Sequence, residues 1–132
     1  MNILCPNCWR EINESVAVCP ACDATVDLYS RNYEQRLITA LPSSESGKRV
    51  QICLILGLLA HRTSVSALVE ALHDPELNVR VAALRSLGEI GDKSAIPGVE
   101  KLTNSNHEVL RRTAQSVLKT LFGKDKPTAL PR

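Results

Sequence analysis

The chain has 132 residues, of which 44% are apolar but only 3% aromatic, and its formal net charge is +2. This composition allows one small apolar core and disfavours an aromatic-lined pocket for nucleic acid or a cofactor. The longest apolar run, residues 52–60, is about half a membrane span, so we expect no membrane segment and no membrane partner.

The charge is unevenly distributed along the chain. Residues 1–30 carry one basic and four acidic side chains, whereas residues 31–132 carry 15 basic and 10 acidic ones. A weak positive charge on the longer part is compatible with a nucleic-acid partner but does not require one.

Residues 1–31 are predicted to form a metal site. Cys5 and Cys8 form one CPxC pair and Cys19 and Cys22 form a second, with ten residues between Cys8 and Cys19. Each pair is short enough to place both sulfur atoms on one side of a turn, and four thiolates can surround a tetrahedral Zn²⁺. Four protein ligands leave no open position, so we expect one structural zinc ion. With so few apolar side chains, this segment would take its folding energy from the metal.

Other interpretations of the four cysteines were weighed against zinc. A thioredoxin-like redox pair lacks its βαβ surroundings. A rubredoxin-like iron site uses the same ligands and stays open. Two disulfides would fit an oxidising compartment, whereas the two CxxC pairs favour a reducing one. The first residues also lack the basic start and long apolar segment of a signal peptide, so we expect a cytoplasmic protein.

Residues 9–12 and 15–18 are predicted to form two short strands about a turn at Asn13-Glu14. Together with the doubled CPxC pattern, residues 3–26 resemble a minimal zinc ribbon of the CPxCG…CPxCG kind. Two features depart from that pattern. The glycine after each second cysteine is replaced, by Trp9 and by Asp23, and the gap of ten residues between the pairs is shorter than usual. Trp9 is interpreted as packing on the ribbon or the first helix, with an exposed anchor for a partner as the alternative.

From residue 33 onward the sequence repeats with a period of 31. Two helices per unit at this period indicate a solenoid. The equivalent positions include Arg49, Arg80 and Arg111, and Leu56, Leu87 and Leu118. Helices are predicted at about 33–41, 46–60, 65–73, 75–90, 95–103 and 107–122.

The middle unit has the clearest boundaries. Asp74 is predicted to cap a helix whose first residue is Pro75, and Gly91 suits the left-handed residue after its end. The run LHDPELNVR at 72–80, followed by LGEIG at 87–91, resembles the short bacterial-type HEAT repeat of the phycobilisome-lyase-like class. The likeness covers about residues 33–123. It implies a binding scaffold and no lyase activity.

We therefore expect an all-α fold: a short α-solenoid of three HEAT-like helical hairpins with a small N-terminal β zinc ribbon. Residues 1–31 would form the ribbon and its joint, residues 32–123 the repeats, and residues 124–132 a flexible tail. The three repeats are expected at about 33–64, 65–95 and 96–123.

The predicted helix at 46–60 is apolar nearly all round, which indicates that it is covered on more than one face. The middle repeat would cover one side. We expect the ribbon or its joint to cover another and to cap the stack, with a second chain as the alternative cover. Cys53 is interpreted as a small buried apolar residue.

The arginines at 49, 80 and 111 are expected to form a structural ladder, one per repeat. In HEAT-like stacks this position resembles the arginine that bonds to an acidic or carbonyl group of the neighbouring turn. The alternative is a row of guanidinium groups that binds phosphate or carboxylate.

The sequence contains no Gly-rich phosphate loop, no GxSxG and no HExxH, so we expect no enzyme. The leading hypothesis is a non-catalytic adaptor or regulatory scaffold that binds a protein partner on the face of the second helices. The alternatives are a nucleic-acid-binding protein, which uses the basic solenoid surface and the ribbon, and self-association through an open end of the stack. The candidate partner-binding residues are Arg85, Glu89, Arg112, Gln115, Ser116 and Lys119.

Overall fold

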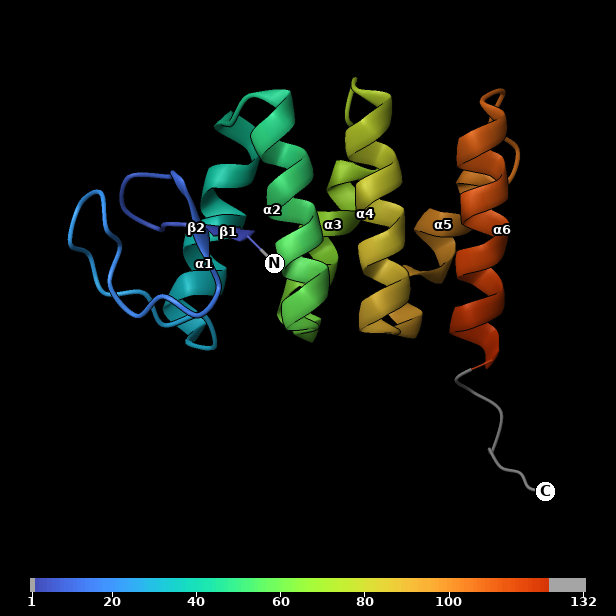
Figure 1. The fold of residues 1–132 in the computed structure, drawn as a ribbon. Helices are drawn as coiled ribbons and strands as arrows, with labels where there is room; N and C mark the ends of the chain where they lie inside the picture. The colour runs from blue at the N-terminus through green and yellow to red at the C-terminus, as the bar shows by residue number, and fades with distance from the viewer. Residues whose placement is uncertain (1, 124–132) are drawn as a thin grey trace.

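The computed structural model describes residues 2–123, and the predicted tail at 124–132 lies outside them. Six helices pack as three hairpins beside a two-stranded sheet, which confirms the predicted fold class (Figure 1). No helix within the described range is both long and apolar enough for a membrane crossing. The elements are β1 (Asn2–Leu4), β2 (Glu11–Asn13), α1 (Arg31–Ala40), α2 (Ser46–Leu59), α3 (Val65–Ala71), α4 (Leu77–Ile90), α5 (Ile96–Leu102) and α6 (Glu108–Gly123).

The second helices α2, α4 and α6 stand side by side, and the first helices α1, α3 and α5 lie behind them (Figure 1). Two of these second helices end in the same way, one period apart. Ala60 and Gly91 follow them with φ of 55° and 73°, and each backbone N–H bonds back into the last turn. This left-handed residue reverses the chain into a short 3₁₀ turn that begins the next hairpin.

The middle turn differs from the prediction. Helix α4 begins at Leu77, and Glu76 is its N-cap residue, so Asp74 does not cap the helix and Pro75 lies outside it. The Asp74 carboxylate instead accepts the Glu76 N–H at 2.9 Å, which closes a tight Asx-type turn between the two helices. Both oxygens of the same carboxylate also accept hydrogen bonds from Arg49 of the preceding repeat.

A buried carboxylate joins the first two hairpins. Glu34 in α1 is only 1% exposed, and the hydroxyls of Thr63 and Ser64 donate to its Oε2 at 2.7 and 2.5 Å. The Ser64 hydroxyl therefore bonds to Glu34. Although Ser64 is the N-cap residue of α3, its side chain does not cap that helix as serine usually does. Helix α1 is capped instead by Ser30, whose hydroxyl accepts the Tyr33 N–H.

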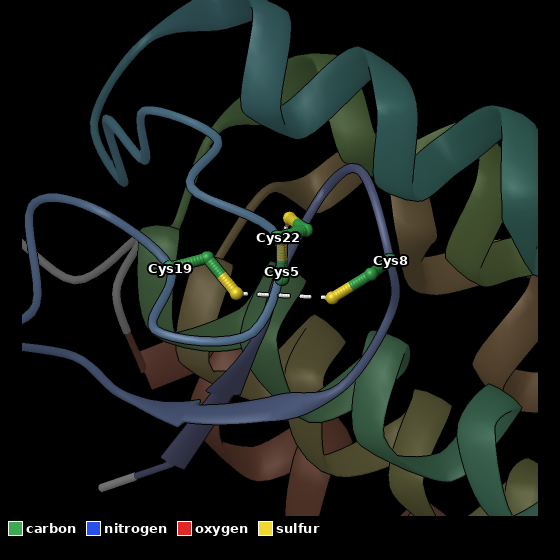
Figure 2. Close-up of side chains that lie close together, drawn as sticks. All are labelled: Cys5, Cys8, Cys19 and Cys22. Carbon is green, nitrogen blue, oxygen red and sulfur yellow. Dashed lines mark hydrogen bonds between the residues drawn. The ribbon is translucent and has the colours of Figure 1, made fainter.

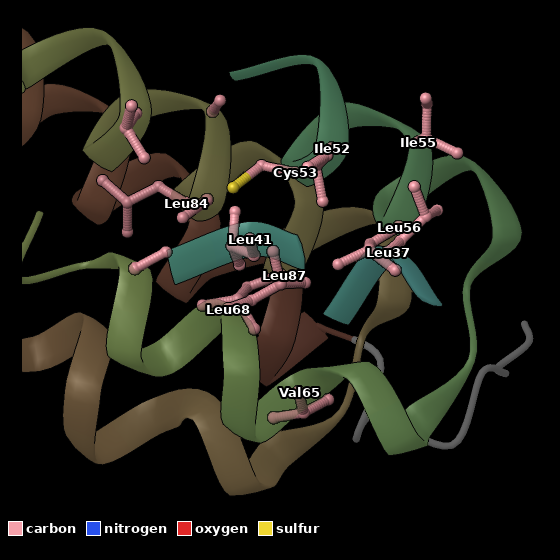
Figure 3. Close-up of a cluster of buried hydrophobic side chains, with 14 of the residues drawn as sticks. Leu37, Leu41, Ile52, Cys53, Ile55, Leu56, Val65, Leu68, Leu84 and Leu87 are labelled. Carbon is pink, nitrogen blue, oxygen red and sulfur yellow. The ribbon is translucent and has the colours of Figure 1, made fainter. Parts of the chain in front are cut away.

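One continuous apolar core extends from the ribbon to α6, and Figure 3 shows its part around α1–α4. Leu56 and Leu87 are fully buried at equivalent positions of successive layers. Leu118 is half-buried, because α6 is the last helix of the described stack. Each layer is thus covered by its neighbours, which is how repeat arrays gain stability.

Helices α2 and α4 pack tightly against each other at Gly57 and Ser86. A Cβ atom on Gly57 would lie 2.9 Å from the Ser86 Cα, so only glycine fits there. The Ser86 hydroxyl donates to the Cys53 carbonyl oxygen at 2.5 Å across the same contact. Burial raises the pKa of the Cys53 thiol to about 12, so this cysteine is an unreactive core residue, as expected.

The ribbon strands pair differently from the prediction. Strand β2 pairs with β1, with Ile3 opposite Ile12, and not with residues 15–18. Val18 instead bridges to Thr25. Each CPxC knuckle therefore forms the tip of its own small hairpin. The predicted single hairpin between the two cysteine pairs is therefore wrong.

Candidate metal centre and interaction surfaces

The four ribbon cysteines converge on one point (Figure 2). All four Sγ atoms lie within 4.8 Å of one another; Cys5 and Cys22 are 3.6 Å apart, and Cys8 and Cys19 are 3.7 Å apart. A tetrahedral metal ion with bonds of about 2.3 Å to sulfur requires S···S distances of about 3.8 Å. The cluster therefore has the size of a four-thiolate site that can hold one metal ion.

The two knuckles have the same hydrogen bonds, which hold the sulfur atoms in place. In the first knuckle, the Asn7 N–H donates to the Cys5 Sγ at 3.4 Å and the Trp9 N–H donates to the Cys5 carbonyl at 3.0 Å. In the second, the Ala21 N–H donates to the Cys19 Sγ at 3.4 Å and the Asp23 N–H donates to the Cys19 carbonyl at 2.9 Å. Such N–H···S bonds orient thiolate ligands and stabilise their negative charge.

Trp9 and Asp23 occupy the two places where the ribbon pattern usually has glycine. Both adopt left-handed backbone conformations, with φ of 62° and 63°. The knuckle geometry is thus retained without glycine, although each non-glycine residue there costs about 1–2 kcal/mol. The metal site must be stable enough to hold both strained residues.

The thiols are electrostatically unequal. Hydrogen bonds from the Asn7 side chain and the Ala24 backbone lower the pKa of Cys22 to about 6. The Arg10 backbone acts to lower the pKa of Cys8, but burial and the three neighbouring thiols outweigh it and raise that pKa to about 11. Cys22 therefore loses its proton to a metal ion more readily than Cys8 does.

The ribbon is docked on the first hairpin, as the apolar character of α2 predicted. The buried Tyr33 hydroxyl donates to the Leu4 carbonyl at 2.8 Å, and Lys48 Nζ donates to the Trp9 carbonyl at 2.8 Å. Ile55 of α2 is 1% exposed, although no helix precedes α2 on that side within residues 2–123. Strand β1 packs against α2, so the ribbon occupies the place that a preceding second helix would take. Trp9 itself is half-buried beside α1.

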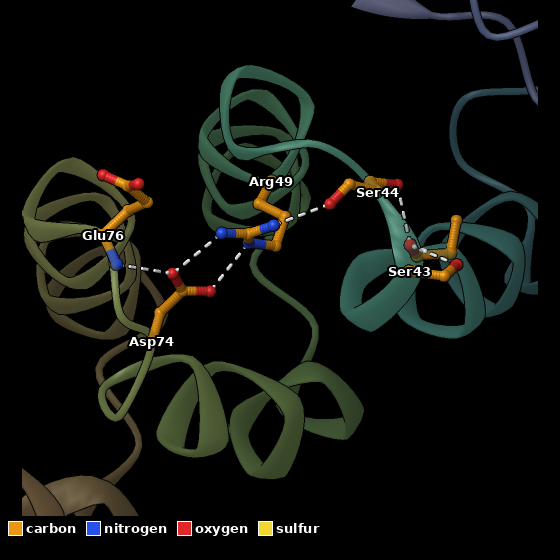
Figure 4. A network of polar contacts seen from close by, with 6 residues as sticks. Ser43, Ser44, Arg49, Asp74 and Glu76 are labelled. Carbon is orange, nitrogen blue, oxygen red and sulfur yellow. Dashed lines mark hydrogen bonds and ion pairs between the residues drawn. The ribbon is translucent and has the colours of Figure 1, made fainter.

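The three ladder arginines have different partners. Arg49 Nε and Nη2 donate to the Asp74 carboxylate at 2.7 and 3.0 Å, and its Nη1 donates to the Ser44 carbonyl (Figure 4). Arg111 donates to the Ser105 carbonyl at 3.1 Å. Arg80 has a buried Nε without a hydrogen-bond partner among residues 2–123. The residue one period after Asp74 is Ser105, so Arg80 lacks the carboxylate that Arg49 has.

The Arg49–Asp74 pair links the first two repeats electrostatically. Burial acts to raise the pKa of Asp74, but the Arg49 hydrogen bonds, the Glu76 N–H and the charges of Arg49 and Arg80 outweigh it and lower that pKa. A lowered folded-state pKa gives stability that is present above the unfolded-state pKa and is lost as the pH falls through the folded-state value.

Asp74→Asn is therefore expected to lower the free energy of unfolding at pH 7. Below about pH 4, where the unfolded carboxyl also titrates, the difference from the wild type should shrink. Urea unfolding of both proteins between about pH 6 and pH 3 measures it. Glu76→Gln removes the same charge two residues away, from an exposed side chain, and is the matched control. An Asp74→Asn deficit that stays constant with pH would contradict the ion pair.

A groove of about 570 Å³ lies between α4 and α6 on the face of the second helices. It brings together four of the six predicted partner-binding residues: Arg85, Glu89, Arg112 and Ser116. Arg112 Nη2 lies 3.6 Å from Glu108 Oε2, and this exposed ion pair contributes little to stability. The hydroxyls of Thr113 and Thr120 and the apolar side chain of Val117 also line the groove.

The structure places the other two predicted residues elsewhere. Gln115 and Lys119 are exposed, and one period earlier their positions hold Leu84 and Gly88, which face α6. They therefore lie on the end of the stack and not in the groove. Polar side chains at this end resemble the terminal capping that solenoids require, which disfavours self-association through it.

The sequence analysis missed two exposed leucines in α2. Leu54 is 39% exposed and Leu58 is 47% exposed, on the same face as the groove. The apolar circumference of α2 indicated cover on more than one face, and the ribbon and α4 provide it, but they leave this stripe open. The repeat could have shown that these two positions are exposed, because the equivalent positions in α4 and α6 are polar.

Comparisons with known proteins agree with this architecture. A family model for HEAT repeats matches residues 34–119, about two thirds of the chain. No curated protein matches the sequence. Human deoxyhypusine hydroxylase, solved in complex with glycerol, is structurally similar with a TM-score of 0.66 at 20% sequence identity. The match covers 71% of this chain but 33% of that protein, so it supports the fold alone.

Proposed function

We propose that this chain, which belongs to the HEAT-repeat family, is a non-catalytic adaptor that binds another protein on the face of its second helices. Repeat stacks of this kind generally act as protein-interaction scaffolds. The proposed adaptor works in the cytoplasm, where a reducing environment keeps ribbon thiols available for a metal ion.

The observation that carries this proposal is the groove between α4 and α6. It gathers two guanidinium groups, one carboxylate and several hydroxyls on a surface supported by rigid helices. The Arg85 guanidinium makes no ion pair with any residue in the described range. Such a surface suits a partner segment that supplies a carboxylate to Arg85 and hydrogen-bonding groups to the hydroxyls.

We further propose that the ribbon metal is a single structural zinc ion. Two of the sulfur–sulfur distances, 3.6 and 3.7 Å, are close to the value expected around tetrahedral zinc, and all four sulfur atoms lie within 4.8 Å of one another. All four ligands would come from the protein. When bound, zinc supplies folding energy to residues 2–28 and fixes the two knuckles. The chain's own contribution is to present the thiolates, supported by N–H···S bonds, and to dock the ribbon through Tyr33 and Lys48.

Nucleic-acid binding is the competing function. It rests on the basic residues of the helical part, but the groove contains Glu89 and no aromatic side chain for base stacking. The two functions differ in their response to salt. Binding driven by phosphate contacts weakens steeply as salt rises, whereas binding driven by apolar and short polar protein contacts does not.

Loss of the groove cations is expected to abolish partner binding without affecting the fold. The immobilised protein and its Arg85→Glu/Arg112→Glu variant would be incubated with native lysate, and the retained proteins quantified by mass spectrometry. We expect one set of proteins to be depleted at least ~10-fold, because both charged contacts become repulsive. Arg36→Glu on α1 is a control on another face. Equal retention by both proteins, or salt-sensitive binding of duplex or single-stranded DNA, would contradict the proposal.

A further inference from the structure

The two CPxC knuckles approach each other through two pairs of sulfur atoms (Figure 2). The Cys5 Sγ lies 3.6 Å from the Cys22 Sγ, and the Cys8 Sγ lies 3.7 Å from the Cys19 Sγ. Each of these pairs joins one knuckle to the other. A disulfide has a sulfur–sulfur bond of about 2 Å, so each pair would have to approach by less than about 2 Å to form one. The cluster that can hold a metal ion is therefore also close to a cross-linked form.

Each of the two pairs combines a buried cysteine with an accessible one. Cys5 and Cys19, the first cysteine of each knuckle, are fully buried, whereas Cys8 and Cys22 are partly exposed. Oxidation selects cysteines by their exposure and their thiolate character. An oxidant from solvent can thus reach one sulfur of each pair, and the buried sulfur of the opposite knuckle stands within 3.7 Å of the sulfur that is attacked.

We infer that hydrogen peroxide converts the zinc-loaded ribbon to a metal-free form in which the disulfides Cys5–Cys22 and Cys8–Cys19 replace the metal ion as the link between the knuckles. In each pair, the accessible thiolate attacks one peroxide oxygen, the O–O bond breaks, and a sulfenic acid and hydroxide form. The buried thiolate then attacks that sulfur, so the S–S bond forms, the S–O bond breaks and a second hydroxide leaves. Two thiolates lose two electrons and one peroxide is reduced, and solvent protons convert the hydroxides to water.

After both steps the ribbon has no thiolate left to hold a metal ion, but its two knuckles stay connected. The cross-links close the loops 5–22 and 8–19, which restricts the unfolded chain and stabilises the folded ribbon. Disulfides within each CPxC pair would instead release the metal and leave the knuckles unconnected. The cross-linked ribbon is expected to keep its contact with α2 and the hydrogen bonds from Tyr33 and Lys48. Oxidation would then exchange one fastening of the ribbon for another.

Disulfide mapping of the oxidised full chain tests the inference, which rests on the proposed zinc site. Native mass spectrometry first measures the metal, and a chain that binds no zinc would overturn both. About two equivalents of hydrogen peroxide should release one zinc ion per chain, since each disulfide consumes one peroxide. Trypsin cleaves after Arg10, between the knuckles, so cross-linked knuckles stay joined and locally paired ones separate. Fragmentation of the joined peptides assigns the partners, and Cys53 should remain a thiol.

The metal-free chain oxidised in urea is the matched control for the folded geometry. In the unfolded chain, the short loops within each CPxC pair are expected to close more often, because loop closure favours nearby residues. Local pairs in the zinc-loaded protein, or the same pairing in both samples, would overturn the inference and leave the zinc site standing.

Amide hydrogen exchange tests whether the disulfides take over from the metal ion. Exchange in α2 should remain as slow in the oxidised, metal-free chain as in the zinc-loaded one, and should become faster when a chelator removes the metal from the reduced chain. Loss of α2 protection in the cross-linked chain would contradict the exchange of one fastening for another.

Discussion

Replacing Cys19 with serine is expected to release the metal ion and to unfold residues 2–28, while the helices stay folded but become less stable. Cys19 is fully buried, and its Sγ lies 3.7 Å from that of Cys8. Structural zinc contributes about 10–16 kcal/mol to the folding of small domains, far more than so short a segment gains from its few apolar side chains. Metal content by native mass spectrometry, together with thermal unfolding, measures both effects.

The helices are expected to lose stability because the ribbon covers part of them. Unfolding of the ribbon would expose Ile55 and the ring of Tyr33, at a cost of about 1.5–3 kcal/mol for each side chain. Cys53→Ala is the matched control, since it removes the fifth cysteine from the core without touching the cluster. It should retain one metal ion per chain. Full metal occupancy in Cys19→Ser would exclude the four-thiolate site.

Gly57→Ala and Gly88→Ala are expected to change stability in opposite directions, although the two glycines are equivalent by the repeat. A Cβ on Gly57 would lie 2.9 Å from the Ser86 Cα, a backbone atom that can move only if α2 and α4 separate. Overpacking of this kind costs about 1–3 kcal/mol, and loss of the Ser86–Cys53 hydrogen bond adds about 1 kcal/mol. These costs outweigh the gain in helix propensity of about 1 kcal/mol.

At Gly88 the same substitution has room. Its Cβ would lie 3.4 Å from a methyl group of Val117, an ordinary contact, so the gain in helix propensity of up to about 1 kcal/mol should remain. Urea unfolding of the two variants beside the wild type gives both values. If both substitutions stabilise or both destabilise by similar amounts, the close approach of α2 and α4 is not as described.

Much of the helical architecture could be predicted from the sequence because the same pattern of residues recurs in each repeat. The spacing of Leu56, Leu87 and Leu118 gave the layers, and the run after Leu72 gave the resemblance to HEAT repeats that the family match confirms. A periodic pattern identifies an element from local residues alone, so three copies strengthen one another.

What could not be predicted depends on contacts between distant segments. Asp74 was assigned to its own helix, whereas its carboxylate serves Arg49 of the previous repeat. The burial of Glu34 was not predicted, because its two hydroxyl partners, Thr63 and Ser64, lie about 30 residues further along the chain. The predicted strand pairing of the ribbon was wrong because the chain reverses at the two CPxC knuckles and not at the residues between them.

The exposed leucines of α2 show the limit of reading one helix at a time. A helix that is apolar nearly all round is predicted to be covered, but the pattern does not show which of its sides are covered. The comparison that separates the covered stripe from the open one is between repeats: Ile55 faces the ribbon, whereas Leu54 takes the place that Arg85 has in the next layer.

Amide hydrogen exchange with and without the metal ion tests most directly whether the metal-bound ribbon stabilises the stack from one end. After metal removal by a chelator, exchange should become faster in residues 2–28 and in α2, less so in α4, and should remain unchanged in α6, because each layer depends on its nearest neighbour. Uniformly faster exchange in all helices, or unchanged protection of α2, would contradict this account.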